Sequence, residues 1–178
     1  MRITLIRHLP TEWNRKQRLQ GSRDIPISDV SDTDQRRIAF NQQILQSLSP
    51  FDIVLASTLR RTQQTARLYG YHPETEHLLD ELNFGRFEGQ SKEKLFEDFG
   101  NEWLENPKVL VLGERMDHFE ERISLFLKKY QAYSNILVFG HGSWIRALIS
   151  LSRYGDINRM NKVLVENNDC ITVPFQDG

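Results

Sequence analysis

The stretch "LIRHLPTEWN", residues 5–14, begins as an apolar run and changes character at its third residue. Residues 2–7 are rich in isoleucine and leucine, which predicts a short buried strand. Arg7 and His8 end this run, and Pro10 follows almost at once. We therefore expect the strand to deliver a positive charge and an imidazole to its carboxyl end.

Strand-like and helix-like segments alternate along the rest of the chain, whereas residues 9–31 are polar and are expected to form an irregular loop. We expect strands at 2–7, 52–57, 77–82, 135–142 and 170–175, and helices at 32–48, 58–70, 91–107, 114–133 and 143–155. The apolar strands show little two-residue alternation, which is typical of strands covered on both faces. The sequence therefore predicts an α/β fold, a three-layer α/β/α sandwich with a mostly parallel central sheet.

Two helices show a regular apolar spacing. Phe40, Ile44 and Leu48 recur at every fourth residue of the first predicted helix. In the third helix, the buried stripe is expected to consist of Leu95, Phe99 and Trp103, with Pro107 ending the helix. We find no linker, repeat or low-complexity tract, and we expect one domain over residues 1–178.

The composition limits the function classes. A net charge of −1 argues against a general binder of nucleic acid or anionic membranes, and the basic run 15–23 suits a solvated loop beside an anionic substrate. The longest apolar runs are far shorter than the about 18 residues of a membrane span. The single cysteine, Cys170, excludes an internal disulfide, and residues 1–8 lack a signal-peptide pattern. These features predict a soluble cytoplasmic protein.

Ionisable side chains lie at the ends of the first four predicted strands. In open α/β sheets the ligand crevice lies beyond the carboxyl ends of the strands. We therefore expect one site to collect Arg7, His8, Arg60, Arg61, Asp80, Glu81 and His141. Gly140 and Gly142 flank His141 and would let the backbone approach a ligand closely.

This combination of side chains suits phosphoryl transfer. Arginine binds oxyanions through several charge-assisted hydrogen bonds. A neutral histidine is a fair nucleophile near pH 7, and a carboxyl group can protonate a leaving oxygen. The sequence therefore predicts that arginines hold a phosphoryl group while a histidine attacks its phosphorus.

The chain contains, in this order, "LIRHLPTEWN", "ASTLRRTQQTA", "LLDELNFGRFEGQS" and "VFGHGSWIRAL". These four segments resemble the motifs of the histidine phosphatase superfamily, the phosphoglycerate mutase-like group. "LIRHLPTEWN" with "QGSRDIPIS" resembles its opening Arg-His-Gly-x-(Thr/Ser)-x-x-Asn signature. "ASTLRRTQQTA", "LLDELNFGRFEGQS" and "VFGHGSWIRAL" resemble its Ser-x-Leu-x-Arg-Ala, Glu-x-x-x-Gly-x-x-Glu-Gly and Ser/Gly-His-Gly segments. "GERMDHFEERI" is similar to the stretch before its late helix. The resemblance covers the chain from end to end and implies a phosphoglycerate mutase-like fold.

The resemblance also implies two groups of site residues. The catalytic group is His8, Glu81, Arg7, Arg61 and His141. The substrate-binding group is Asn14, Gln20, Gly21 and Gly142. In the implied mechanism His8 is phosphorylated on a ring nitrogen and Glu81 protonates the leaving oxygen. No metal or other cofactor is expected, because cationic side chains would neutralise the phosphate and no metal-ligand spacing occurs.

Two positions depart from the family pattern. Leu9 stands at the place of the glycine after the nucleophile, and it would either point away from the pocket or narrow it. Thr62 stands where the family often has alanine, and we expect this change to be tolerated.

Several of these residues have a second interpretation. His8 taken alone suits a core histidine bonded to a backbone carbonyl, and Arg60 is expected to be an exposed helix residue. Glu81 could form a salt bridge with Arg86. Glu88 is the alternative proton donor, although we expect it to be structural.

The leading hypothesis is a metal-independent phosphomonoesterase that hydrolyses a small phosphorylated metabolite through phospho-His8. Mutases of the superfamily are usually longer, so 178 residues favour hydrolysis, with segment 88–116 as a small cap over the leaving group. The alternatives are a phosphoglycerate mutase-type phosphotransferase and a non-catalytic module that binds a phosphorylated ligand. The expected partner is a small-molecule phosphate ester, and no pattern specifies an oligomeric state.

Overall fold

The computed structural model of the chain describes residues 1–176. Its centre is a five-stranded sheet in the order β3-β2-β4-β1-β5. The strands are β1 (Arg2–Arg7), β2 (Ile53–Ala56), β3 (Glu74–Thr75), β4 (Asn135–Gly140) and β5 (Cys170–Pro174). Strands β1, β2, β3 and β4 are parallel to one another, and β5 lies antiparallel against β1. The prediction of an α/β fold with a mostly parallel sheet is confirmed.

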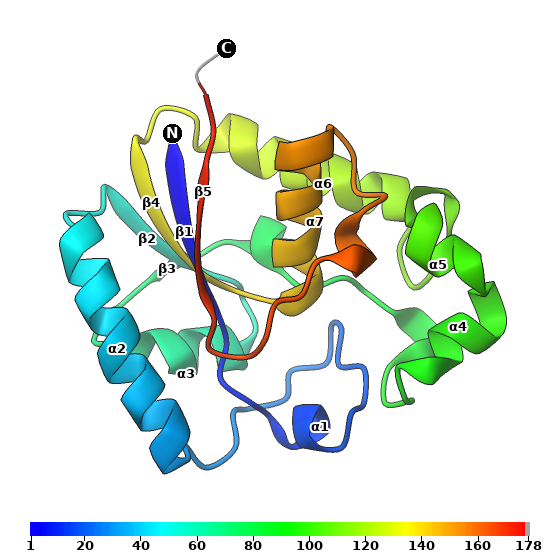
Figure 1. Ribbon diagram of the computed structural model, residues 1–178, viewed down its shortest axis with the longest axis horizontal. Helices are drawn as coiled ribbons and strands as arrows, with labels where there is room; N and C mark the ends of the chain where they lie inside the picture. The colour runs from blue at the N-terminus through cyan, green and yellow to red at the C-terminus, as the bar shows by residue number, and fades with distance from the viewer. Residues whose placement is uncertain (177–178) are drawn as a thin grey trace.

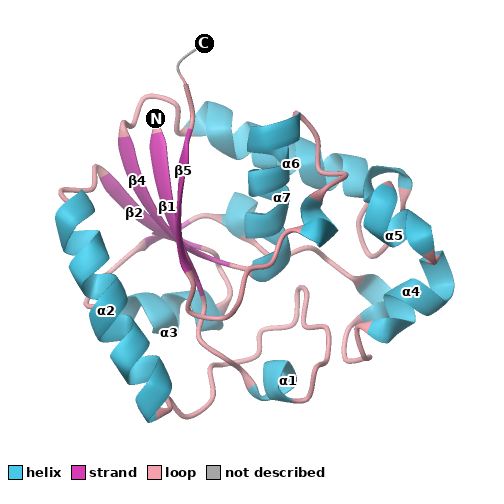
Figure 2. Ribbon diagram, viewed as in Figure 1, coloured by secondary structure: helices cyan, strands magenta, loops and turns pink. Residues whose placement is uncertain are grey.

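Helices cover both faces of this sheet (Figures 1 and 2). Those beside the sheet are α2 (Asp32–Leu48), α3 (Arg60–Leu68), α6 (Met116–Lys129) and α7 (Gly142–Tyr154), and those farther from it are α1 (Glu12–Arg15), α4 (Glu93–Phe99) and α5 (Asn101–Glu105). α2 and α3 lie on one face, and α6 and α7 lie on the other. Within residues 1–176, no helix has the length and apolar composition needed to cross a membrane.

Alternate residues of the central strands point to opposite faces of the sheet. On β1, Leu5 packs in the apolar cluster with α6 and α7, whereas Ile6 packs in the cluster with α2 and α3. Val138 and Phe139 of β4 divide in the same way. Both faces are therefore buried, which explains why these strands are apolar runs in the sequence, interrupted only by Thr4.

The strand predicted at 77–82 is wrong. The short strand β3 ends before this segment, and residues 77–79 form a 3-10 turn. The buried Glu76 carboxylate explains the turn, because it accepts the Leu78 N–H at 3.0 Å and is held by two side chains at the end of α6. Glu81 therefore reaches the carboxyl edge of the sheet from a loop.

The single helix predicted over 91–107 is also wrong. Gly100, with a φ of +57°, separates α4 from α5. Leu95 and Trp103 of the predicted stripe are buried, and Phe99 is partly buried against the same cluster. Two short helices therefore form this part of the chain, because a left-handed glycine ends the first of them.

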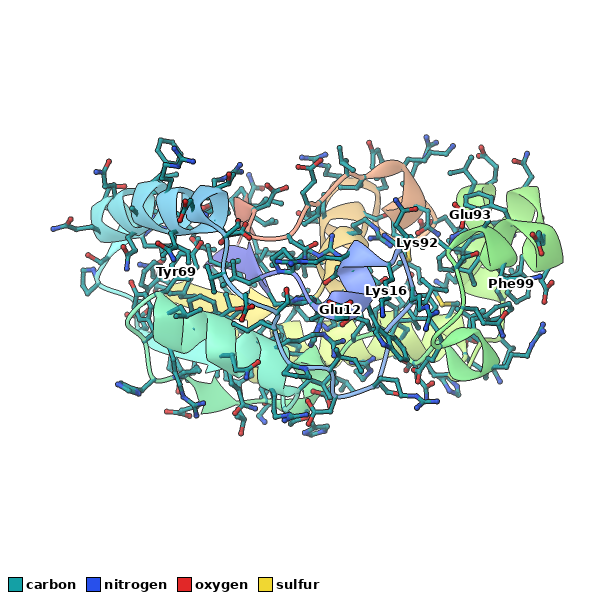
Figure 3. The ribbon with its side chains drawn as sticks, turned by 90° about the horizontal axis from the view of Figure 1, so that it is seen from below. Glu12, Lys16, Tyr69, Lys92, Glu93 and Phe99 are labelled. Atoms are coloured by element: carbon teal, nitrogen blue, oxygen red, sulfur yellow. The ribbon has the colours of Figure 1, made fainter. Side chains whose placement is uncertain are left out.

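The predicted loop 9–31 contains the short helix α1. Thr11 and Asn14 form a capping box, in which the Thr11 hydroxyl accepts the Asn14 N–H and the Asn14 side chain accepts the Thr11 N–H. Glu12 and Lys16 form an ion pair of 3.3 Å on its exposed face (Figure 3). This capping box places the Asn14 side chain beside the end of β1.

Helix α2 spans the predicted residues but buries a different face. Ile38, Asn41 and Leu45 are buried, whereas Phe40 is 60% exposed. The four-residue spacing that starts at Phe40 therefore predicts the helix but not its packing.

Strands β1 and β4 end side by side. Arg7 is paired with Gly140 in the ladder, and the His8 N–H donates to the Gly140 carbonyl at 3.0 Å. His8 and His141 therefore leave adjacent strands at the same level, and both imidazoles reach the carboxyl edge of the sheet.

Candidate active site

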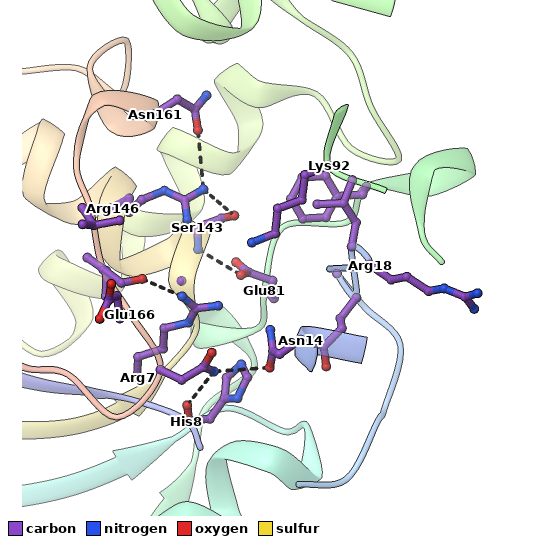
Figure 4. Close-up of a pocket in the computed structure, with 18 of the residues that line it drawn as sticks. Arg7, His8, Asn14, Arg18, Glu81, Lys92, Ser143, Arg146, Asn161 and Glu166 are labelled. Carbon is purple, nitrogen blue, oxygen red and sulfur yellow. Dashed lines mark hydrogen bonds between the residues drawn. The ribbon is translucent and has the colours of Figure 1, made fainter. Parts of the chain in front are cut away.

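A cavity of about 640 Å³ lies at the carboxyl ends of the central strands (Figure 4). Eight of the nine predicted site residues line it: Arg7, His8, Asn14, Gln20, Gly21, Arg61, Glu81 and Gly142. The ninth, His141, is fully buried, and its ring centroid lies 5.4 Å from that of His8. The structure therefore brings the predicted residues together around one cavity.

His8 presents one ring nitrogen to this cavity. Only 2% of the residue is exposed, and Nδ1 lies 2.7 Å from the Leu9 carbonyl oxygen. Because a carbonyl oxygen can only accept, Nδ1 of the neutral ring carries the proton and Nε2 keeps a free lone pair. Burial, followed by the charges of Arg61 and Arg7, holds the pKa of His8 well below its ordinary value. The neutral imidazole is the form that a nucleophile needs.

Backbone carbonyl groups, rather than carboxylates, hold the two arginines. Arg7 Nη1 donates to the Val165 oxygen at 2.5 Å. Arg61 donates through Nη1 to the Arg23 oxygen at 2.5 Å and through Nη2 to the Gly21 oxygen at 2.8 Å. Burial lowers the pKa of each arginine to about 10, so both keep their charge at neutral pH. Their charges are therefore available to an anion.

A short hydrogen-bonded chain orients His141. Its Nε2 lies 2.7 Å from Ser57 Oγ, which lies 2.9 Å from Thr62 Oγ1. The Thr62 hydroxyl donates to the Leu59 carbonyl at 2.9 Å, so the single Ser57 proton serves either Thr62 Oγ1 or His141 Nε2. When it serves His141 Nε2, the neutral His141 ring carries its own proton on Nδ1. Burial, more than the charge of any neighbour, holds the pKa of His141 well below its ordinary value.

Three buried side-chain nitrogen atoms within residues 1–176 have no hydrogen-bond partner: Arg7 Nε, Arg61 Nε and His141 Nδ1. All three belong to the predicted catalytic group. A buried donor without a partner costs roughly 1–3 kcal/mol. A Cβ at Gly142 would lie 3.0 Å from Arg7 Cζ, so this glycine lets the start of α7 approach the guanidinium. The set is shaped for an anion with several acceptor oxygens.

Glu81 lies against the N-terminus of α7. Its Oε1 accepts the N–H groups of Leu82 at 2.9 Å and Trp144 at 3.0 Å, and its Oε2 accepts the Ser143 N–H at 2.9 Å. The positive end of the helix dipole faces this carboxylate. The backbone therefore fixes the carboxyl group at the edge of the cavity (Figure 4).

Asn14 and Gln20 are bonded through their amide oxygens. Asn14 Oδ1 accepts the Thr11 N–H at 3.0 Å and the Asn167 amide at 3.2 Å, and Gln20 Oε1 accepts the Thr11 hydroxyl at 2.7 Å. Within residues 1–176, neither amide NH₂ group donates to a protein atom. Gly21 adopts a φ of +55°, which favours glycine, and its carbonyl accepts the hydrogen bond from Arg61 Nη2. The two amides can therefore donate to a ligand.

Leu9 points away from the cavity. It is 1% exposed in the apolar cluster with α2 and α3, and its N–H donates to Thr65 Oγ1 at 2.9 Å. Of the two outcomes expected for Leu9, pointing away from the pocket is therefore observed, and narrowing of the pocket is not. Pro10, the next residue, lines the cavity.

The charged residues Arg60, Glu88 and Arg86, for which the sequence left a second interpretation, each have a different partner. Arg60 Nε binds Asp24 at 3.2 Å on the surface, as expected for an exposed helix residue. The Glu88 carboxylate accepts the N–H and the hydroxyl of Ser22, which fixes the loop around Gly21. Arg86 pairs with the Asp98 carboxylate of α4 at 2.7 Å, and not with Glu81 as the second interpretation expected.

The sequence patterns do not single out five further residues that line the cavity: Lys92, Ser143, Arg146, Asn161 and Asn167. Arg146 lies four residues after Gly142, so both share a face of α7. This spacing could have predicted that Arg146 lines the cavity. The other positions carry no periodic signal, because they lie at element ends or in loops.

Cations outnumber carboxylates around the cavity. The cationic lining residues are Arg7, Arg18, Arg61, Lys92 and Arg146, and the acidic ones are Asp34, Glu81 and Glu166. Within residues 1–176, no group of three or more histidine, cysteine or carboxylate side chains could hold a metal ion. The ligand that this lining favours is an anion.

A sequence model of the histidine phosphatase superfamily (branch 1) matches residues 3–178. The chain belongs to the histidine phosphatase superfamily. This superfamily member is 30% identical over 161 residues to "Putative phosphoserine phosphatase 2" of Hydrogenobacter thermophilus, which covers 84% of this chain and 77% of the relative.

Solved structures show the same fold for this superfamily member. The product of an open reading frame of Mycobacterium tuberculosis matches with a TM-score of 0.81 and 25% identity, covering 99% of this chain and 92% of that one. The alpha-ribazole phosphatase of Shigella flexneri matches with a TM-score of 0.77 and 26% identity, covering 99% and 91%. Other matches are named as phosphoglycerate mutases. The predicted family and the phosphoglycerate mutase-like fold are confirmed, and the names of the relatives indicate phosphatase or mutase activity.

Proposed function

We propose that the protein is a metal-independent phosphomonoesterase that hydrolyses a small phosphorylated metabolite through a phosphohistidine on His8. The observation that carries the proposal is the set of three unpartnered buried nitrogen atoms beside His8, on Arg7, Arg61 and His141. The two guanidinium N–H groups among them reduce stability unless an anion binds them. A phosphoryl group supplies three oxygens for them.

In the first step, the Nε2 lone pair of His8 attacks phosphorus and forms an N–P bond. The P–O bond to the substrate alcohol breaks at the same centre, and its electron pair stays on the leaving oxygen. Protonated Glu81 transfers its proton to that oxygen, so the product leaves as a neutral alcohol. The Leu9 carbonyl keeps the other ring nitrogen protonated and holds the ring in place.

In the second step, Glu81 takes a proton from water as the water oxygen attacks phosphorus. The N–P bond breaks, inorganic phosphate leaves, and His8 recovers its neutral ring. Glu81 is again protonated, so the cycle closes without a net change in the protein. The first backbone N–H groups of α7 hold Glu81 in one place, so the same carboxyl group can reach the leaving oxygen and then the attacking water.

Arg7, Arg61 and His141 stabilise the charge that spreads over the equatorial oxygens during both steps. Their side chains are already oriented by backbone carbonyls and by Ser57, so little reorganisation accompanies the reaction. The two arginines take the part that Mg²⁺ takes in kinases.

In this proposal, residues 88–116 act as the cap of a single domain over residues 1–178. Lys92, Leu95 and Trp103 of that segment line the cavity and would contact the leaving group. A pocket of about 640 Å³ suits a small metabolite, for which we expect the cytoplasm as the location.

Hydrolysis of an aryl phosphate, with and without EDTA, tests this function. We expect phosphate release that EDTA does not change, that His8→Ala abolishes, and that the matched variant His72→Ala, at an exposed histidine, retains. Phosphate binding without turnover would identify a binding module. Transfer of the phosphoryl group to a second alcohol in preference to water would identify a mutase-type phosphotransferase.

A further inference from the structure

The segment that leads into β5, residues 165–169, lies against the carboxyl end of β1. The Arg7 carbonyl accepts the Asn168 N–H at 3.0 Å, and the Arg7 N–H donates to the Asp169 carbonyl at 3.1 Å. The Arg7 side chain donates in turn to the Val165 carbonyl at 2.5 Å. This one segment therefore holds both the main chain and the guanidinium of Arg7.

Asn167 connects the nucleophile to a candidate donor of the cavity. Its Nδ2 donates to the His8 carbonyl at 3.0 Å and to Asn14 Oδ1 at 3.2 Å (Figure 4). A carbonyl oxygen can only accept, so the bond to His8 fixes which end of the Asn167 amide faces β1. The bond to Asn14 Oδ1 leaves the NH₂ group of Asn14 for a ligand. A single amide thus fixes the main chain of His8 and the orientation of Asn14.

Asn168 keeps the segment in a conformation that most side chains avoid. Its φ of +65° lies in the left-handed region, where asparagine is more frequent than most residues. The residue is 1% exposed. Its Oδ1 accepts the Tyr69 hydroxyl, its Nδ2 donates to the Asp34 carbonyl at 3.2 Å, and its carbonyl accepts the Asn41 amide at 2.8 Å. Asn168 therefore anchors the segment to α2 and to the end of α3.

This anchor is a closed, buried network. The Asn41 amide also donates to the Tyr69 hydroxyl at 2.9 Å, and both residues are buried. Burial raises the pKa of Tyr69 to about 12, so its hydroxyl keeps the proton that it donates to Asn168. Asn41, Tyr69 and Asn168 do not line the cavity. Their polar groups can therefore act on the reaction only through the segment that they hold.

The sheet itself does not hold the reacting residues. The ladder with β4 ends at Arg7, and the ladder with β5 ends at Ile6. His8 lies beyond both ladders. The bonds from Asn167 and Asn168 continue the support of the chain past the point where β5 stops pairing with β1.

On the basis of the proposed function, we infer that Asn167 and Asn168 are positioning residues, which hold the His8 imidazole and the Arg7 guanidinium where the phosphoryl group reacts. A nucleophile must lie about 3–3.5 Å from the atom that it attacks, and a misplacement of about 1 Å costs up to about 10²-fold in rate. Asn167 acts directly on the main chain of His8. Asn168 acts on Arg7, through its own N–H and through the conformation of the segment.

Kinetics of two variants test this role. Asn168→Gly keeps the left-handed conformation and loses the side-chain bonds, and Asn167→Ala loses the amide beside His8. We expect each to lower kcat for nitrophenyl phosphate by roughly 10- to 100-fold, with a smaller change in KM. Ile136→Val, which leaves a methyl-sized gap at the amino end of β4, is the control for lost stability and should keep its kcat. Unchanged kcat in both asparagine variants, or an equal loss in the control, overturns the proposal.

A double-mutant cycle tests the anchor at α3. Tyr69→Phe removes one hydroxyl and keeps the ring. Alone, it should lower kcat by roughly 2- to 10-fold, the value of one hydrogen bond. In the Asn168→Gly background it should have no further effect, because the acceptor of that hydroxyl is already absent. Additive losses would mean that Tyr69 acts by another route, which overturns the anchoring role of Asn168.

Nitrogen-15 NMR of the His8 ring separates this proposal from the proposed function, because it needs no turnover. The bond to the Leu9 carbonyl favours the Nδ1–H tautomer. Asn167→Ala and Asn168→Gly should show a mixture with the Nε2–H tautomer, whereas Ile136→Val should show one tautomer. If no ester is hydrolysed but the mixture is observed, the proposed function fails and the hold on His8 is supported. One unchanged tautomer in both asparagine variants overturns the positioning role, with or without hydrolysis.

Discussion

Replacement of Glu81 by glutamine probes folding and chemistry at one position. The carboxylate accepts three backbone N–H groups with two oxygens. Glutamine has one oxygen, which can keep the Leu82 and Trp144 bonds, but its NH₂ group then faces the Ser143 N–H. Two donors oppose each other, and a buried N–H without an acceptor costs about 1–3 kcal/mol. We expect Glu81→Gln to lower the free energy of unfolding by about that amount.

The catalytic effect should depend on the leaving group. Loss of a general acid slows proton-dependent steps by about 10²- to 10⁴-fold. An alkyl phosphate needs this proton, because its leaving alkoxide is strongly basic, whereas a nitrophenolate leaves without it. Glu81→Gln should therefore reduce kcat/KM for an alkyl phosphate by at least about 10²-fold more than for nitrophenyl phosphate.

Steady-state kinetics with the two esters and urea unfolding measure these effects. Glu93→Gln removes an exposed carboxylate of α4 and should change neither quantity. Equal losses of kcat/KM on both esters would refute the role of Glu81 as the acid and direct attention to Glu88. An unchanged free energy of unfolding would refute the hydrogen bonds assigned to the carboxylate.

Three other changes have defined outcomes. Arg61→Ala should lower kcat by about 10²- to 10³-fold, as loss of a transition-state donor does, and a negligible loss would leave the phosphate to Arg7. Thr62→Val should lower kcat/KM by up to about 10-fold, because Ser57 loses the partner that orients it toward His141, and unchanged kinetics would show that Ser57 needs no such partner. The two buried histidines have lowered pKa values, so the unfolded chain binds more protons below about pH 6.5 than the folded chain does. The contribution of the two histidines to the free energy of unfolding should thus be fully present above this pH. It should fall toward pH 5 by up to about 1.4 kcal/mol per pH unit for each histidine. A free energy of unfolding in urea that is independent of pH over this window would contradict the burial of neutral rings.

The sequence predicts the central strands well because their burial leaves a local signal. β1 and β4 are covered on both faces, so their residues form apolar runs that only Thr4 interrupts. The strand predicted at 77–82 is wrong because residues 77–79 of this apolar segment form a 3-10 turn. The buried Glu76 carboxylate that ends β3 has partners at the end of α6, about fifty residues later, and such a contact leaves no periodic pattern.

The candidate site was predictable to the extent that each residue belongs to a local motif. The nine predicted residues gather around one cavity, because four strands are parallel and share a carboxyl edge. The contribution of Thr62 was not predictable, because the pairing of β2 with β4 brings its partner Ser57 to His141. Lys92 and Arg146 were missed for a similar reason, since they lie far apart in the sequence and meet at one cavity only in the folded chain.

The most direct measurement asks whether phosphate becomes covalently attached to His8. The protein is mixed briefly with a phosphate ester in the presence of EDTA and quenched in alkaline denaturant, since the N–P bond of phosphohistidine hydrolyses in acid. Peptide mass spectrometry then locates the phosphoryl group. We expect it on the peptide that contains His8, and we expect no adduct in His8→Ala. Phosphate release without any adduct, or an adduct on another residue, would contradict the mechanism.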